Sequence, residues 1–135
     1  MFCLGPLGAG HTMKAMNKLV SAAGFAAACE AVIVGQRAGL DPAAMIEVFN
    51  ASTGRNFSTE KSMGKIVART FDAGFSLGLF AKDVKIAADL AQAEGCPSPI
   101  SRTVSEWMAE ARDALGGEHD HTLAYTYWDT KRIRS

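Results

Sequence analysis

The sequence has almost none of the strict apolar–polar alternation that marks a half-buried β-strand. Its one short candidate, residues 75–80, carries Gly78, and an interior glycine weakens a strand. Apolar residues recur instead at helical spacing between glycine and proline breaks. We therefore predict an all-α fold of about six or seven helices without a sheet.

Paired cysteines and net charge are also lacking. Cys3, Cys29 and Cys96 lie far apart and form no C-x-x-C pair, which argues against a disulfide framework and a zinc site and favours a reducing, cytoplasmic location. Lysine plus arginine (14) balances aspartate plus glutamate (14), so charge gives no reason to expect nucleic acid or an anionic membrane as a partner.

Long apolar runs and targeting signals are missing too. The apolar stretch 19–29 ends at Glu30, short of the roughly 20 residues that span a bilayer, and no secretory signal is visible. Gly5, Gly8 and Gly10 are spaced G-x-x-G-x-G, which is not the dinucleotide fingerprint G-x-G-x-x-G. We interpret residues 1–10 as an interdomain linker and residues 11–135 as one domain.

The longest predicted helix covers about residues 12–38, with Gly39 as its C-terminal cap. At 1.5 Å per residue it would be about 40 Å long, as long as a small domain. Its middle, residues 21–29, consists almost entirely of small side chains, which let neighbouring helices approach closely. We therefore predict one long central helix, enclosed by the others.

Shorter helices are predicted after it. Asp41–Pro42 and Ser98–Pro99 each place a capping residue before a proline at the first helical position. Asp120 can cap a last short helix. The predicted ranges are 42–50, about 59–69, about 81–94 and 99–115, and the last helix carries Leu123, Tyr125 and Tyr127.

Polar residues gather at the start of the long helix. Lys14, Asn17, Lys18 and Ser21 are spaced i, i+3, i+4 and i+7, so they share one face. Lys14 has two interpretations: a lysine whose charge reaches water near a helix end, or a lysine in a domain cleft. In a cleft, loss of water would favour the neutral amine, which could exchange a proton with a substrate hydroxyl. Asn17 would then offer that substrate both a donor and an acceptor.

Lys82 and two histidines are further candidates. Lys82 would lie near a helix N-terminus, where a cation is unfavourable and an anionic ligand would explain it. The alternative is a solvated lysine paired with Asp83. His119 and His121 stand at i and i+2 in a turn, which rarely makes a full metal site, so we predict a solvated loop and no metal.

Residues 8–17, GAGHTMKAMN, resemble the G-x-G-x-x-x-K-x-x-N signature of the β-hydroxyacid dehydrogenases, the family of 3-hydroxyisobutyrate dehydrogenase. Weaker matches follow in the family's order and spacing, and together they are specific. They are Glu30–Ala31, AGLDP at 38–42, the loop Ser52–Gly54, Phe71 with Gly74–Phe75, Lys82–Val84, GCPSP at 95–99, and Gly117 with Asp120.

This resemblance implies the helical C-terminal domain found in 6-phosphogluconate and 3-hydroxyisobutyrate dehydrogenase-like proteins. It implies that Lys14 is the catalytic lysine, that Asn17 binds substrate, and that Lys82 and Phe75 belong to the cofactor side. The implied cofactor is NAD or NADP, the implied substrate is a small 3-hydroxy acid, and the implied assembly is a homo-oligomer.

The sequence departs from the family in two ways. Lys18 stands where relatives carry a second amide, so we assign it to substrate binding, where it could hold a second substrate anion, influence Lys14 or face water. The family's N-terminal Rossmann domain is not among these 135 residues, and without a positioned cofactor there is no hydride donor. We expect the chain alone to be inactive.

One alternative from another class stays open. It is a stand-alone helical module that dimerises through the long helix and does no chemistry. A second enzyme, 6-phosphogluconate dehydrogenase itself, fits less well because its helical domain is much longer.

Overall fold

A computed structural model describes residues 8–131, and within this range the chain is all helical, as predicted. The elements are α1 (Ala9–Arg37), α2 (Pro42–Asn50), α3 (Phe57–Lys61), α4 (Met63–Val67), α5 (Leu77–Ala93), α6 (Pro99–Leu115), the 3₁₀-helix η1 (His121–Leu123) and α7 (Ala124–Thr130). β-type pairing in this range is limited to an isolated antiparallel bridge between Ser76 and Asp120. Most of the predicted linker, with Cys3, lies outside the described residues.

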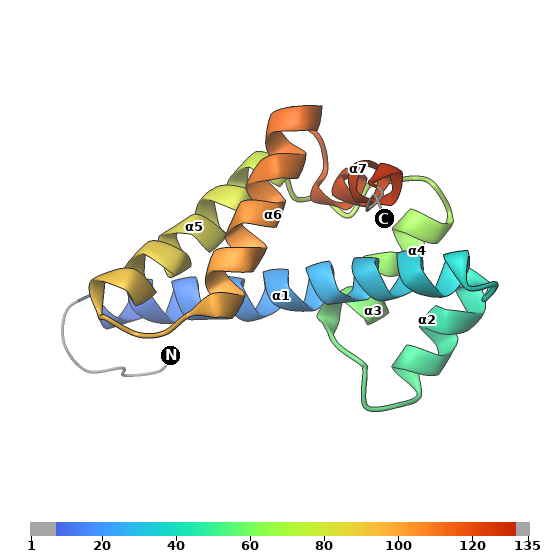
Figure 1. The fold of residues 1–135 in the computed structure, drawn as a ribbon, viewed down its shortest axis with the longest axis horizontal. Helices are drawn as coiled ribbons and strands as arrows, with labels where there is room; N and C mark the ends of the chain where they lie inside the picture. Colours follow the sequence, from blue (N-terminus) through green and yellow to red (C-terminus); the bar gives the residue numbers. More distant parts are fainter. Residues whose placement is uncertain (1–7, 132–135) are drawn as a thin grey trace, which may run out of the picture.

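Helix α1 is the long axis around which the other helices are arranged (Figure 1). It begins earlier than predicted, because Gly8 adopts a left-handed conformation (φ 97°) and acts as its N-cap. It ends as predicted at Gly39 (φ 104°). The Gly39 N–H donates to the Gln36 carbonyl and the Leu40 N–H donates to the Gly35 carbonyl, which together form a Schellman motif.

The small residues of α1 let other helices approach it closely. Helices α5 and α6 pack on its N-terminal half, and α2 folds back against its C-terminal end (Figure 1). A Cβ atom on Gly35 would collide with the Met45 sulfur of α2. A Cβ on Gly24 would lie 3.2 Å from the Asn56 amide nitrogen, at the start of α3.

The helix predicted over residues 59–69 is two short helices, α3 and α4, which meet at Ser62. A capping box starts α3 before Thr59: the Asn56 side chain accepts from the Thr59 N–H, and the Thr59 hydroxyl accepts from the Asn56 N–H, each at 2.9 Å. The end of α4 turns sharply, because Arg69 and Phe71 both have positive φ (61° and 50°).

Helix α5 begins at Leu77, also earlier than predicted, because the Ser76 hydroxyl accepts from the Leu79 N–H at 3.2 Å. The weak strand candidate over residues 75–80 is therefore mostly helical. Lys82 lies in the second turn of α5 and not at its N-terminus, so the prediction that it opposes the helix dipole is wrong, since that effect is confined to the first turn.

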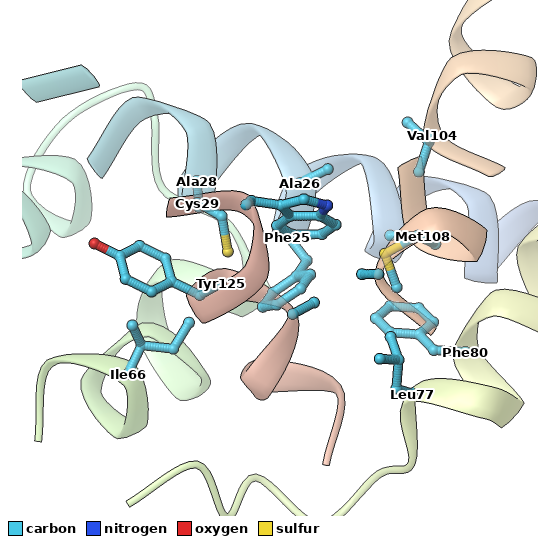
Figure 2. Close-up of a cluster of buried hydrophobic side chains, with 14 of the residues drawn as sticks. Phe25, Ala26, Ala28, Cys29, Ile66, Leu77, Phe80, Val104, Met108 and Tyr125 are labelled. Carbon is cyan, nitrogen blue, oxygen red and sulfur yellow. The ribbon is translucent and has the colours of Figure 1, made fainter. Parts of the chain in front are cut away.

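Phe25 of α1 lies fully buried at the centre of the core, with 0% of its surface exposed. Figure 2 shows it between Tyr125 and Ile66 on one side and Phe80, Leu77 and Met108 on the other. Burying an aromatic side chain of this size stabilises a fold by about 1.5–3 kcal/mol. Trp128 also packs on Phe25, with 5.8 Å between ring centroids, and it stacks on Trp107 at 4.2 Å, which joins α6 to α7.

The two cysteines within the described residues, Cys29 and Cys96, are unpaired. Cys29 belongs to the core, and burial raises the pKa of its thiol well above the ordinary value. Cys96 is exposed after α5.

The prediction that other helices enclose α1 is wrong for one face. Met13, Val20 and Val34 are 49%, 71% and 62% exposed, and exposed Ala27 completes a seven-residue spacing. We call these four residues the open stripe. By length and composition alone α1 could cross a membrane, a test that the core helix of a globular protein also passes. Here its opposite face holds Phe25 and Cys29 in the core.

The Asp120 carboxylate joins the segment before α5 to the segment before α7. One oxygen accepts from the N–H groups of Gly74 (2.7 Å) and Phe75 (3.2 Å). The other accepts from the N–H of Thr122 (3.0 Å) and from its hydroxyl. Burial alone would raise the pKa of Asp120, but these hydrogen bonds hold it below its ordinary 3.8. We call this set of bonds the Asp120 clamp, and it confirms Asp120 as a cap.

Backbone bonds extend the clamp on both sides. The His121 N–H donates to the Phe75 carbonyl (2.7 Å), the Leu77 N–H to the His119 carbonyl (2.8 Å) and the Gly78 N–H to the Gly117 carbonyl (2.9 Å). Gly78 and Gly117 approach so closely that a Cβ on Gly78 would lie 3.0 Å from the Gly117 carbonyl oxygen.

His121 is part of the core, so the prediction of a solvated loop is wrong for this residue. It is only 7% exposed and packs edge-on against Phe25 and Phe80, with ring centroids 4.8 and 5.0 Å apart. Its Nδ1 lies 3.1 Å from the Phe75 carbonyl oxygen. Burial lowers the pKa of His121 below its ordinary 6.5, with nearby Lys18 acting in the same direction, while the Phe75 carbonyl and Asp120 oppose the shift.

We expect Gly78→Ala to lower the free energy of unfolding by about 1–3 kcal/mol, because the added methyl group meets backbone that cannot rotate away. Gly64→Ala is the matched control, because a Cβ there meets nothing within 4 Å in helix α4. That change should stabilise the fold by about 0.5–1 kcal/mol. Urea denaturation measures both, and equal effects of the two changes would contradict the close approach at Gly78.

We also expect the domain to lose stability as the pH falls from about 8 to about 5. Because the folded pKa of His121 lies below 6.5, the unfolded chain takes up this proton first, and stability present above about pH 6.5 is lost below it. Asp120 acts only at lower pH, near and below 3.8. His121→Asn keeps a donor for the Phe75 carbonyl but removes the titrating ring. The urea denaturation midpoint of the variant should therefore change less between pH 8 and pH 5 than that of the parent. Parallel profiles of midpoint against pH would disprove the assignment of this pH dependence to His121.

Candidate functional site

A hollow of about 270 Å³ lies where α1, α3, the segment before α5 and η1 meet. We call it the Lys18 hollow. It is lined by Lys18, Ser21, Phe57, Ser58, Lys61, Ser62, Ala73, Phe75, Phe80 and His121. Larger grooves between α5 and α6 and between α1 and α2 contain none of the predicted site residues.

The structure brings together two predicted site residues that are far apart in the sequence. The Lys18 ammonium lies 4.4 Å from the centre of the Phe75 ring, a cation–π contact worth about 0.5–1 kcal/mol at an exposed site. Phe75 is held there by the Asp120 clamp, since its N–H donates to Asp120 and its carbonyl accepts from His121. The position of Lys18 thus depends on a contact between α1 and the segment before α5.

Lys14 and Asn17 lie on the exposed part of the same helix. Lys14 precedes Lys18 by one turn, so their Cβ atoms are about 5–6 Å apart. Both Lys14 and Asn17 are exposed, and neither lines the hollow. The cleft predicted around Lys14 is therefore not formed by residues 8–131, and a second surface would have to cover it.

Lys82 does not line the Lys18 hollow. It is exposed, and within the described range it does not form the ion pair with Asp83 that the sequence left open. It follows Phe80, which lines the hollow, by half a helical turn. The structure thus places Phe75 beside Lys18 and leaves Lys82 free on the adjoining surface of α5.

The electrostatics of the Lys18 hollow favour an anion. Two lysines line it, Lys18 and Lys61, and no aspartate or glutamate is among its described lining residues. His121 contributes no charge near neutral pH, because burial, with help from Lys18, lowers its pKa. A carboxylate or phosphate entering the hollow would meet two ammonium groups and several hydroxyls.

Sequence reasoning missed the four other polar residues of this hollow. Ser58, Lys61 and Ser62 lie on α3 and at its end, and His121 lies on η1. His121 was expected in a solvated loop, although Asp120 before it was recognised as a cap. A capped segment that also carries Leu123 and Tyr125 signals folding onto the core, and that signal places His121 inside.

Comparisons with known proteins agree with the fold. A family model described as NAD-binding of NADP-dependent 3-hydroxyisobutyrate dehydrogenase matches residues 8–128. The chain is 29% identical over 131 residues to 2-(hydroxymethyl)glutarate dehydrogenase from Eubacterium barkeri, covering 96% of this chain and 43% of that protein. It is 32% identical over 117 residues to L-threonate dehydrogenase from Cupriavidus necator, covering 86% of this chain and 39% of that protein.

A solved structure shows the same arrangement of helices. The crystal structure of 3-hydroxyisobutyrate dehydrogenase from Salmonella typhimurium superposes with a TM-score of 0.84 at 28% identity. The match covers 89% of this chain and 42% of that one. The chain thus spans about two fifths of the length of these relatives.

The family model extends over nearly all of the described helices, and the resemblance seen from Lys14 to Asp120 lies within it. The chain therefore belongs to the 3-hydroxyisobutyrate dehydrogenase family of NAD(P)-dependent β-hydroxyacid dehydrogenases, and it corresponds to an all-helical part of those enzymes.

Proposed function

We propose that this chain forms the substrate-side half of the active site of an NAD(P)-dependent dehydrogenase that interconverts a small 3-hydroxy acid and its semialdehyde. One observation carries the proposal: the first turns of α1 place Lys14, Asn17, Lys18 and Ser21 on one face, beside a cationic hollow closed by Phe75. Family membership supports it, since the similar proteins named above are dehydrogenases.

Lys14 is proposed to move the proton. In the oxidation direction its neutral amine accepts the proton of the substrate hydroxyl as the carbonyl forms, and in the reverse direction its ammonium returns that proton. Asn17, one turn along, can donate to and accept from the same substrate and so orient it. NAD(P), when bound, supplies the acceptor for the hydride that leaves the carbinol carbon.

The residues of this chain fit one end of such a cofactor. Lys82 offers an exposed ammonium without a carboxylate partner in the described range, and Phe75 offers a half-buried ring fixed by the Asp120 clamp. Together they provide a cation for a phosphate and an apolar face for a ring. They lack the backbone cradle of a dinucleotide loop, so we propose that a Rossmann domain N-terminal to α1 binds most of the cofactor.

That second domain would also complete the environment of Lys14. Lys14 is exposed in this chain, and covering an amine removes water and favours the neutral form that accepts a proton. We propose for this reason that the chain alone is inactive and that closure of the two halves activates Lys14.

The open stripe of α1 favours association as well. Met13, Val20, Ala27 and Val34 leave an apolar row exposed along the helix, and such rows commonly mark interaction surfaces. This observation supports the proposal of a homo-oligomer, and it is also what the alternative function, a non-catalytic dimerisation module, would require. We propose a cytoplasmic location as well, on the unpaired pattern of the cysteines.

Lys14→Ala should cut the turnover rate by about 10²–10⁴-fold while leaving cofactor affinity nearly unchanged, because only the proton transfer is lost. The measurement uses this chain fused behind the part of the C. necator L-threonate dehydrogenase that it does not cover. Lys85→Ala is the control, since Lys85 is exposed on α5 and paired with Asp89. Equal rates in the Lys14 variant and its parent would end the assignment.

The chain without such a domain should not oxidise L-threonate or 3-hydroxyisobutyrate above background, since no cofactor is positioned for hydride transfer. NADH formation followed by absorbance, with the fusion protein as positive control, measures this. Turnover by the purified chain alone would contradict the half-site proposal. If neither the chain nor the fusion protein shows activity and the chain forms a dimer, the dimerisation module would be favoured.

A further inference from the structure

We infer that the Lys18 hollow binds a second carboxylate of the substrate, so that the preferred 3-hydroxy acid is a dicarboxylic acid. The identity of the ligand as a substrate rests on the proposed function. The anion-binding site itself is argued from contacts and burial within the described residues.

Two buried hydroxyls in the hollow lack protein partners. Ser58 and Ser62 are 4% and 3% exposed, and within residues 8–131 neither hydroxyl forms a hydrogen bond. Both line the hollow, and both are more than nine-tenths buried. Among the described residues, the buried side-chain atom without a partner is Asn50 Oδ1 and neither serine oxygen, so both hydroxyls are accessible from the hollow and can donate to an acceptor there. A carboxylate is acceptor-only when ionised, which matches the hydroxyl and ammonium donors of the hollow.

Two ammonium groups complete the donor set. Neither Lys18 nor Lys61 forms an ion pair with a carboxylate in the described part of the chain. The Phe75 ring at 4.4 Å from the Lys18 ammonium restricts that side chain without neutralising it. Two cations in one small hollow repel each other, so a bound anion would relieve the repulsion as well as satisfy the serines.

The spacing of Lys14 and Lys18 sets the length of the substrate. Residues one turn apart on a helix face have Cβ atoms about 5–6 Å apart. An extended chain gains about 1.2 Å per bond, so a carboxylate at the Lys18 hollow lies about four bonds from a carbinol carbon at Lys14. A five-carbon diacid that carries a hydroxymethyl branch next to one carboxylate has this reach, because its carbinol carbon lies about four bonds from the far carboxyl carbon. The substrate of a monocarboxylate enzyme would leave the hollow without an anion.

Lys18 therefore determines specificity in this proposal. An asparagine or glutamine at this position would offer one neutral donor group to an incoming carboxylate, whereas the ammonium offers a full charge. Lysine at position 18 therefore makes a subsite that favours a second negative charge.

Ligand titration of the chain followed by amide NMR tests the anion site without any need for dehydrogenase activity. The probes are glutarate and, as the matched monocarboxylate, butyrate. We expect glutarate to shift the signals of Ser58, Ser62 and Phe75 and to bind at least about 10-fold tighter than butyrate. Lys18→Asn and, independently, Lys61→Gln should each remove most of that preference, while Lys85→Gln, on the far part of α5, should keep it.

Three outcomes would overturn the inference: equal binding of glutarate and butyrate, full preference retained in both lysine variants, or inorganic phosphate bound in the hollow more tightly than glutarate. In the fusion protein, a 3-hydroxy acid with a second carboxylate should be preferred over its monocarboxylate analogue in kcat/KM, and Lys18→Asn should reverse this. If glutarate binds as expected but the fusion protein shows no turnover with either acid, the proposed function fails and the anion site remains.

Discussion

The Asp120 carboxylate is the point on which the arrangement of the site depends. Four donors from two chain segments converge on its two oxygens, and the segments are separated by the whole of α5 and α6. This convergence fixes Phe75 next to Lys18 and places His121 against Phe25 in the core. Without the carboxylate, several backbone N–H groups would be left without partners at a partly buried site, and each such loss costs about 1–3 kcal/mol.

Much of the fold could be predicted because its signals are local. Asp41 accepts from the Ala44 N–H as a cap before Pro42, and Gly39 ends α1 in the left-handed conformation that glycine favours. The start of α3 at Phe57 could not be predicted in the same way. It is fixed by Asn56, which caps α3 and also donates to the Gly24 carbonyl of α1, a contact between residues distant in sequence.

In the candidate site, too, local features could be predicted from the sequence and contacts between distant segments could not. Helical spacing alone placed Lys14, Asn17, Lys18 and Ser21 on one face, and family resemblance supplied their roles. Neither could show that Lys18 and Ser21 line a hollow while Lys14 and Asn17 stay exposed, because that difference arises from α3 and Phe75 packing beside one turn of α1. The burial of His121 likewise follows from the clamp and from aromatic contacts across the chain.

Helix α1 has one further consequence because it runs from Ala9 to Arg37 without interruption. Its first turns carry the polar face, and the next turns carry Phe25, Cys29 and Val32 into the core. The residues that would contact a ligand and the residues that pack in the core therefore belong to one continuous helix. The N-terminal turns of α1 and the core cannot unfold independently of each other. Occupancy near Lys18 is thus thermodynamically linked to global unfolding, so a ligand that binds only the folded state must raise the melting temperature of the entire domain.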